Sequence, residues 1–150
     1  MSAGQEESMG LIVAGIDHSV EAQRALRFAL AEARLRGARL RVVHALDPFS
    51  SYPSLAVAVG PARQAAGELL ERVADEAEED ADDLVIERRV VDGSPGSVLV
   101  AESRGADLLV VGSRGHGGFV GLLLGSVSQQ CAHHAECPVV IVRQPPARSE

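Results

Sequence analysis

Glycines gather between positions 108 and 127 in a pattern that suits anion binding. The stretch begins with an apolar run, LLVVG, and ends in a second Gly-Ser; its glycines are Gly112, Gly115, Gly117, Gly118, Gly121 and Gly125. Glycine lets a backbone adopt positive φ or approach a ligand closely. A glycine-rich loop between a buried strand and a helix start can present several N–H groups to an anion, so we expect a phosphate cradle here.

The best-known phosphate-binding motifs are absent. All 14 basic residues are arginine, and the lack of lysine excludes GxxxxGK[ST] and lysine-based covalent chemistry. GxGxxG fails because Val120 stands at the position where it requires a third glycine, and no SGGxDS-type loop of the ATP pyrophosphatases follows the first apolar run. No Ser-His-Asp arrangement, HExxH motif or pair of catalytic carboxylates follows from spacing. We therefore predict no catalytic and no metal-ligating residues.

Composition narrows the class of protein further. A net charge of −7 argues against nucleic-acid binding. The two cysteines, Cys131 and Cys137, do not form a CxxC pair, and we expect them to fill apolar space. The first residues are polar and acidic, unlike a signal peptide, and no apolar run approaches the ~20 residues that span a membrane. We therefore expect a cytoplasmic protein without membrane contact.

Strands and helices alternate along the chain, which predicts a parallel, right-handed doubly wound sheet. The expected strands are Met9–Ile16, Arg39–Leu46, Leu84–Val91, Asp107–Val111 and Cys137–Val142; the expected helices are Val20–Arg36, Pro61–Asp80, Pro95–Arg104 and Gly125–His134. Such sheets bind ligands at the carboxyl ends of their strands, here Gly15–Asp17, Asp92–Gly93 and Gly112–Gly118.

The remaining segments complete the expected domain organisation. Residues 47–60 are expected to form a Ser/Pro-rich loop with an apolar patch, Leu55–Val59. Residues 1–8 are expected to be a disordered tail, 9–143 a single α/β domain and 144–150 a C-terminal tail. His44 is expected to be packed or hydrogen-bonded, and His133 and His134 to complement the dipole of a helix end.

A more specific pattern is Gly112-x2-Gly115-x9-Gly125-Ser126. Together with Asp17, the Val91-Asp92-Gly93 turn, the ADLLVVGSRG block and CPVVIV, it resembles the universal stress protein family, whose ATP-binding branch carries G-x2-G-x9-G-[ST]. The resemblance covers about Met9 to Arg143. It implies a three-layer, doubly wound five-stranded parallel sheet of the adenine-nucleotide-hydrolase-like type, in strand order 3-2-1-4-5.

The candidate site combines residue chemistry with this resemblance. Ser126 lies at a helix N-terminus, where free N–H groups and the helix dipole favour an anion. Asp17 either accepts hydrogen bonds from ribose hydroxyls or caps the following helix. The resemblance implies that the backbone around Val43 faces an adenine. The full set is Gly15, Ile16, Asp17, Val43, Gly112, Ser113, Arg114, Gly115, His116, Gly117, Gly118, Gly125, Ser126 and Val127.

Alternatives stay open at several of these positions. The glycine-rich stretch could be only a structural turn. Arg114 and His116 could contact phosphates or be exposed loop residues. Gly121, within Phe119–Leu124, is expected to belong to a packed connector instead of the contact surface.

The expected function is that of a universal stress protein that binds ATP, AMP or ADP as a regulator, with Mg²⁺ accompanying ATP. No general base is apparent, which favours a regulatory protein with slow hydrolysis at most over a dedicated ATPase. The resemblance implies a homodimer, paired through the apolar terminal strand Pro138–Val142. One alternative is an interaction or scaffold protein that binds no nucleotide. Another is a phosphotransferase or hydrolase with steady turnover.

Overall fold

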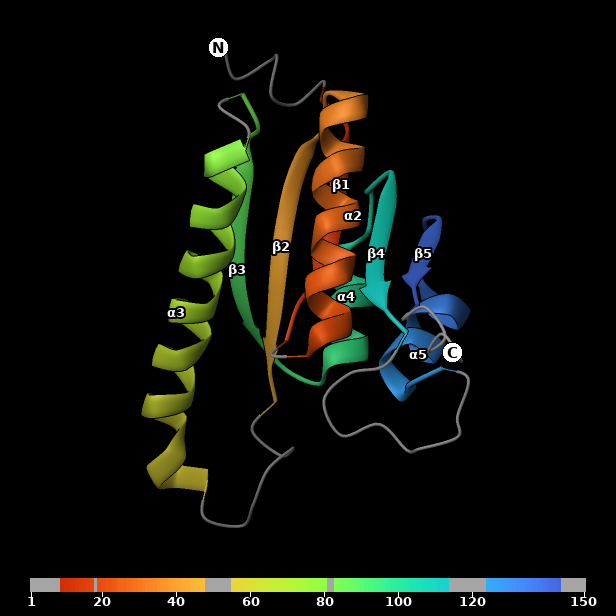
Figure 1. Cartoon of the computed structure of the whole chain (residues 1–150). Coiled ribbons are helices and arrows are strands. Elements are labelled where there is room, and N and C mark those ends of the chain that lie inside the picture. The colour runs from red at the N-terminus through yellow and green to blue at the C-terminus, as the bar shows by residue number, and fades with distance from the viewer. Residues whose placement is uncertain (1–8, 18, 48–54, 81–82, 114–123, 144–150) are drawn as a thin grey trace, which may run out of the picture.

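The computed structural model describes residues 9–17, 19–47, 55–80, 83–113 and 124–143 (Figure 1). Strands and helices alternate in the order β1 (Leu11–Gly15), α2 (Val20–Arg36), β2 (Arg39–Leu46), α3 (Leu55–Asp80), β3 (Ile86–Asp92), α4 (Pro95–Glu102), β4 (Leu108–Gly112), α5 (Ser126–His134) and β5 (Val139–Val142). The 5-stranded sheet has the order β3-β2-β1-β4-β5, and every neighbouring pair is parallel. The predicted fold class and strand order are confirmed.

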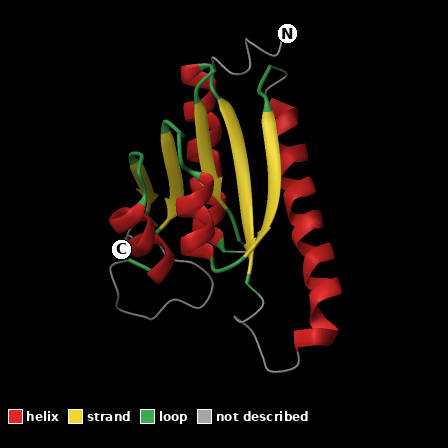
Figure 2. Ribbon diagram, turned by 180° about the vertical axis from the view of Figure 1, so that it is seen from behind, coloured by secondary structure: helices red, strands yellow, loops and turns green. Residues whose placement is uncertain are grey.

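Helices cover both faces of the sheet. Helices α2 and α3 lie on one face, and α4 and α5 lie on the other (Figures 1 and 2). Alternate side chains of β1 enter the two layers: Ile12 and Ala14 join the cluster under α2 and α3, whereas Leu11 and Val13 join the cluster under α4 and α5. Burial on both faces explains why the strand reads as an uninterrupted apolar run.

Local signals set the limits of α2. Ser19 adopts an extended conformation, and its hydroxyl accepts a hydrogen bond from the backbone N–H of Ala22 at 3.1 Å. Gly37 ends the helix with φ of 62°, a conformation that glycine adopts without strain. Between these caps, Ala25, Ala29 and Ala33 are fully buried. Both predicted limits of this helix are confirmed.

Helix α3 begins earlier than expected. It starts at Leu55, so Pro61 lies inside it, and the prediction that residues 55–60 belong to a loop is wrong. Gly60-Pro61 indicates a helix boundary because proline lacks an N–H and crowds the preceding turn. In this structure α3 continues past Pro61 despite the local cost in free energy. Residues 48–54 of the expected loop, and the expected tails 1–8 and 144–150, lie outside the described residues.

Other limits differ from the predictions by one or two residues. Strand β1 is shorter than Met9–Ile16, β5 is shorter than Cys137–Val142, and α4 ends at Glu102, before Arg104. Asp107, expected to begin the fourth strand, precedes β4, and its Oδ2 accepts a hydrogen bond from the Leu11 N–H at 2.8 Å. This bond ties β1 to β4 at the amino edge of the sheet.

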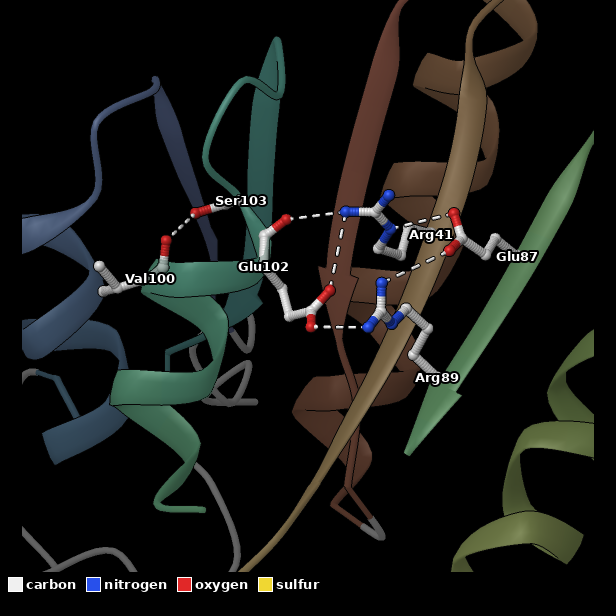
Figure 3. A network of polar contacts seen from close by, with 6 residues as sticks. All are labelled: Arg41, Glu87, Arg89, Val100, Glu102 and Ser103. Carbon is white, nitrogen blue, oxygen red and sulfur yellow. Dashed lines mark hydrogen bonds and ion pairs between the residues drawn. The ribbon is translucent and has the colours of Figure 1, made fainter. Parts of the chain in front are cut away.

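Charged side chains join α4 to β2 and β3 (Figure 3). Arg41 Nε lies 3.0 Å from Glu87 Oε2, and Arg41 Nη1 donates to the backbone carbonyl of Glu102 at 3.0 Å. Arg89 Nη2 lies 3.4 Å from Glu102 Oε1. The side chains of Arg41 and Glu102 are only 17% and 12% exposed. We call these four residues the Arg41–Glu102 network.

Candidate functional site

The neighbouring strands β1 and β4 end at the switch point of the sheet. Residues Ile12–Ala14 of β1 pair in register with Leu108–Val110 of β4. After β1 the chain enters α2 on one face, and the next helix after β4 is α5 on the other (Figures 1 and 2). In doubly wound sheets this divergence opens a crevice for ligands at the carboxyl edge. Two predicted segments, Gly15–Asp17 and Gly112–Ser113, therefore lie side by side here.

Ser113 joins the two ends of the glycine motif. Its carbonyl accepts hydrogen bonds from the Gly125 N–H at 2.6 Å and from the Ser128 hydroxyl at 3.0 Å. Its own N–H donates to the Val142 carbonyl at 2.9 Å, which anchors it to β5. The residue is 5% exposed. The structure thus brings the strand end and the start of α5 together, as the two-part cradle requires.

The start of α5 lacks a side-chain cap. Gly125 is its N-cap residue, in an extended conformation, and no side chain caps the helix there. The Gln129 N–H donates to the Gly125 carbonyl at 3.0 Å, so the N–H groups of Ser126 and Val127 precede the first helical hydrogen bond. Such N–H groups and the helix dipole favour an anion. By contrast, the Ser19 hydroxyl caps α2.

Asp17 stabilises the turn into α2. Its Oδ1 accepts a hydrogen bond from the Ser19 N–H at 2.7 Å, while Ser19 supplies the N-cap. The alternative that Asp17 itself caps the helix is therefore wrong. Asp17 is half-buried at the carboxyl edge.

The end of β1 is linked to β2 by two hydrogen bonds. The Ile16 N–H donates to the Val43 carbonyl at 2.9 Å, and His44 Nδ1 lies 2.9 Å from the Ile16 carbonyl. Since a carbonyl only accepts, the His44 ring donates through Nδ1. The expectation that His44 is hydrogen-bonded is confirmed. Val43 is fully buried, and its carbonyl is engaged in the bond to Ile16.

Two predicted glycines provide space for neighbouring elements. A Cβ on Gly112 would lie 2.9 Å from the backbone carbonyl carbon of Glu21, in the first turn of α2. A Cβ on Gly15 would lie 2.6 Å from Leu99 Cδ1 of α4. Positive φ occurs among the described glycines only at Gly37, Gly93 and Gly105. Gly112 is therefore needed for close packing, and it fills this role without a positive φ.

The other predicted positions in the glycine-rich loop lie outside the described residues. They are Arg114, Gly115, His116, Gly117 and Gly118, and residues 119–123 of the expected connector lie outside as well. Within the described part of the chain, no group of three His, Cys, Asp or Glu residues could hold a metal ion.

The third candidate strand end is occupied by an ion pair that the sequence did not indicate. At the end of β3, both carboxylate oxygens of Asp92 accept hydrogen bonds from Arg63 Nη2, at 2.7 and 2.9 Å. Arg63 lies on α3, 29 residues earlier in the chain. No local pattern marks such a pair in advance.

The two cysteines are protonated at neutral pH. Burial, and secondarily the nearby Cys137, raises the pKa of the Cys131 thiol from 9.0 to about 11. Burial also raises the pKa of Cys137. Cys131 is fully buried, as expected for an apolar filler, whereas Cys137 is partly exposed. His133 and His134 lie in the last turn of α5.

No helix in the described ranges is both long enough and apolar enough to cross a membrane.

Known proteins that resemble this chain are universal stress proteins. Universal stress protein Rv2005c of Mycobacterium tuberculosis is 38% identical over 134 residues, covering 89% of this chain and 45% of the relative. The chain thus spans about half the length of the curated relatives it matches. A solved universal stress protein in complex with cAMP has 32% identity and a TM-score of 0.70, covering 89% of this chain and 96% of that one.

A second solved universal stress protein also matches this chain in fold. The universal stress protein from Archaeoglobus fulgidus in complex with dAMP has 26% identity and a TM-score of 0.62, covering 89% of this chain and 97% of that one. The family model described as "Universal stress protein family" matches residues 9–143. The chain belongs to the universal stress protein family.

Proposed function

We propose that this chain binds an adenine nucleotide, ATP, at the carboxyl edge between β1 and β4, and that it acts as a regulatory module in a stress response. The observation that carries the proposal is the Gly125 N–H bond to the Ser113 carbonyl at 2.6 Å. It joins both parts of the motif and holds the uncapped start of α5 beside the end of β4. An anion placed there meets backbone N–H groups.

The choice of ligand rests on two further arguments. Solved family members carry cAMP and dAMP, which are adenine nucleotides. Asp17 lies on the neighbouring strand end, where its carboxylate can accept hydrogen bonds from ribose hydroxyls. The complete G-x2-G-x9-G-S pattern favours ATP over a monophosphate, because it extends the cradle along the chain from Gly112 to Ser126.

Magnesium would accompany ATP through the phosphates. Since no three His, Cys, Asp or Glu side chains gather among the described residues, the phosphates would provide most of its ligands. No general base has been identified at the site, so we propose regulation by the bound nucleotide, with slow hydrolysis at most. The cytoplasmic location stays a prediction from the sequence.

Co-purified nucleotide provides the first test. The protein is purified without added nucleotide and denatured, and the supernatant is separated by chromatography. We expect released ATP, ADP or AMP, and saturable binding when the emptied protein is titrated with ATP and Mg²⁺. If neither is observed, the chain is an interaction protein without a nucleotide, which is the alternative that the sequence left open.

A charge at Gly125 tests the location of the site. Gly125→Glu places bulk and negative charge at the start of α5, so we expect loss of ATP binding in a folded protein. Gly67→Glu is the matched control, because Gly67 lies on α3 and a Cβ there meets nothing within 4 Å. Wild-type affinity in folded Gly125→Glu would place the nucleotide elsewhere.

We also propose a homodimer formed by the terminal strand. In the described part of the chain, β5 is the last strand of the sheet and pairs only with β4. An apolar edge of this kind offers unpaired backbone groups to a second copy.

A further inference from the structure

The first turn of α2 places Glu21 beside the end of β4. If Gly112 carried a Cβ, that atom would lie 2.9 Å from Glu21 Cβ, so the two residues are in contact. Gly112 is the first glycine of the motif, and its neighbour Ser113 joins both halves of the cradle. Glu21 therefore belongs to the wall of this site, although the sequence marked it only as a first-turn residue.

Helix α2 begins at the carboxyl edge of the sheet, just after Asp17, so Glu21 in its first turn lies near the proposed ligand. The side chains of a helix lean towards its N-terminus, which for α2 is this edge. Glu21 is partly buried. Among the described residues it forms no ion pair, whereas Glu32 of the same helix pairs with Arg36 at 3.0 Å.

The charge balance of the chain determines how the Glu21 carboxylate would act on a bound polyphosphate. Lysine, which commonly neutralises bound phosphates, is absent from the whole sequence. Two carboxylates, Asp17 and Glu21, instead flank the start of α2. A free triphosphate would be repelled by Glu21, because like charges in a partly desolvated site interact strongly. A magnesium ion on the phosphates would be attracted, since carboxylates bind Mg²⁺ directly or through its water shell.

We propose that Glu21 makes this site selective for a magnesium-bound polyphosphate over the free polyphosphate, an inference that rests on the proposed ATP binding. Glu21 acts as a specificity-determining residue. When Mg²⁺ is bound to the phosphates, the Glu21 carboxylate would attract the metal directly or through its water shell.

The test compares the Kd of ATP measured in excess EDTA with the Kd measured in excess Mg²⁺, by calorimetric titration. We expect Glu21→Gln to lower the ratio of these two constants by about tenfold, because one charge is removed near the phosphates. Glu21→Asp keeps the charge and should retain most of the ratio. Glu32→Gln is the matched control: it changes the same charge on the same helix, about 16 Å away, and should keep the wild-type ratio.

The possible outcomes separate the two proposals. A purely structural role for Glu21 would change both constants by the same factor, so a wild-type ratio in a Glu21→Gln protein that binds ATP overturns this inference alone. If the wild-type protein binds ATP in neither condition, the proposed function fails and the inference fails with it. If circular dichroism shows that Glu21→Gln is unfolded, Glu21→Ala gives the same measurement with a strong helix former.

Discussion

At Gly112 the backbone of β4 passes so close to α2 that no side chain fits between them. The obstruction is the backbone and Cβ of Glu21, which cannot rotate away as a flexible side chain would. We expect Gly112→Ala to lower the free energy of unfolding by about 1–3 kcal/mol, since overpacking forces the elements apart. Urea unfolding measures the change.

A second glycine provides the control for this prediction. A Cβ on Gly67 of α3 meets nothing within 4 Å. Gly67→Ala should therefore raise the free energy of unfolding, by up to about 1 kcal/mol, because alanine is the better helix former. Equal effects of the two substitutions would show that the clearance at Gly112 is not needed.

The pKa of Cys131 predicts a loss of stability in alkaline solution. It rises from 9.0 to about 11 on folding because the thiol is buried. Below pH 9 the thiol is protonated in both states, and the stabilising effect of burial is fully present. Between pH 9 and 11 only the unfolded chain loses the proton, so the free energy of unfolding falls.

Cys131→Ala isolates this effect. The difference in free energy of unfolding between wild type and Cys131→Ala should shrink by about 1–2 kcal/mol as pH rises from 8.5 to 10.5. Chemical denaturation at several pH values measures it. Parallel pH profiles of the two proteins would contradict the prediction.

Among the secondary-structure elements, the short helix α4 is joined to the sheet by charged groups as well as by buried apolar side chains. Arg41 contacts both the carbonyl and the carboxylate of Glu102, at 3.0 and 3.7 Å. Replacing it by methionine leaves Glu102 and Glu87 with Arg89 as their cationic partner in the network. We expect Arg41→Met to lower the free energy of unfolding by about 2–4 kcal/mol, because removing one partner leaves half-buried charge poorly compensated.

An exposed ion pair serves as the comparison for this prediction. Arg36 and Glu32 pair at 3.0 Å on the surface of α2, with the Arg36 side chain 47% exposed. Arg36→Met should change the free energy of unfolding by less than about 0.5 kcal/mol, since surface pairs contribute little. Similar losses in the two variants would mean that burial does not strengthen the Arg41–Glu102 network.

Sequence signals predicted those elements whose limits are set locally. Helix α2 was predicted to the residue because Ser19 and Gly37 are strong start and stop signals. Strand β2 was predicted to the residue, between Gly37-Ala38 and the Asp47-Pro48 breaker. The start of α3 was missed because Gly60-Pro61 is a local helix-breaking signal. The helix nevertheless includes Pro61, so this local signal alone does not set its start.

The site was predicted in outline and not in detail. The motif correctly placed Gly112 and Gly125 near each other. The contact of Gly112 with Glu21 joins residues far apart in the sequence, and so does the Arg41 bond to Glu102, 61 residues later. Such contacts depend on the strand order and on the crossing of α2 over β4, which no short pattern encodes.

For the whole molecule, the outer edge of β5 predicts how two copies would meet. The carbonyls of Pro138 and Val142 accept hydrogen bonds from Leu109 and Ser113, so these residues face β4. Backbone groups alternate in direction along a strand, so Ile141 presents its N–H to the outer edge. Ile141→Pro removes that donor, and we expect a monomer at concentrations where the wild type is a dimer.

The control variant for this prediction must lose the same side-chain packing as Ile141→Pro. The Ile141 side chain packs under α4 and α5, and Ile141→Ala removes this contact while keeping the N–H. Sedimentation analysis should show a dimer for Ile141→Ala and a monomer for Ile141→Pro. A dimer in both variants would place the interface on another surface.

The hydrogen bonds of Ser113 fix both ends of the segment that connects the two halves of the glycine motif. The Ser113 carbonyl accepts bonds from Gly125 and Ser128 and its N–H is held by Val142, so both ends of the intervening segment are fixed by the fold. The entropy of closing a loop grows slowly, by about 0.6 kcal/mol for each doubling of its length. A change in the length of the chain between Ser113 and Gly125 would therefore cost the fold little free energy.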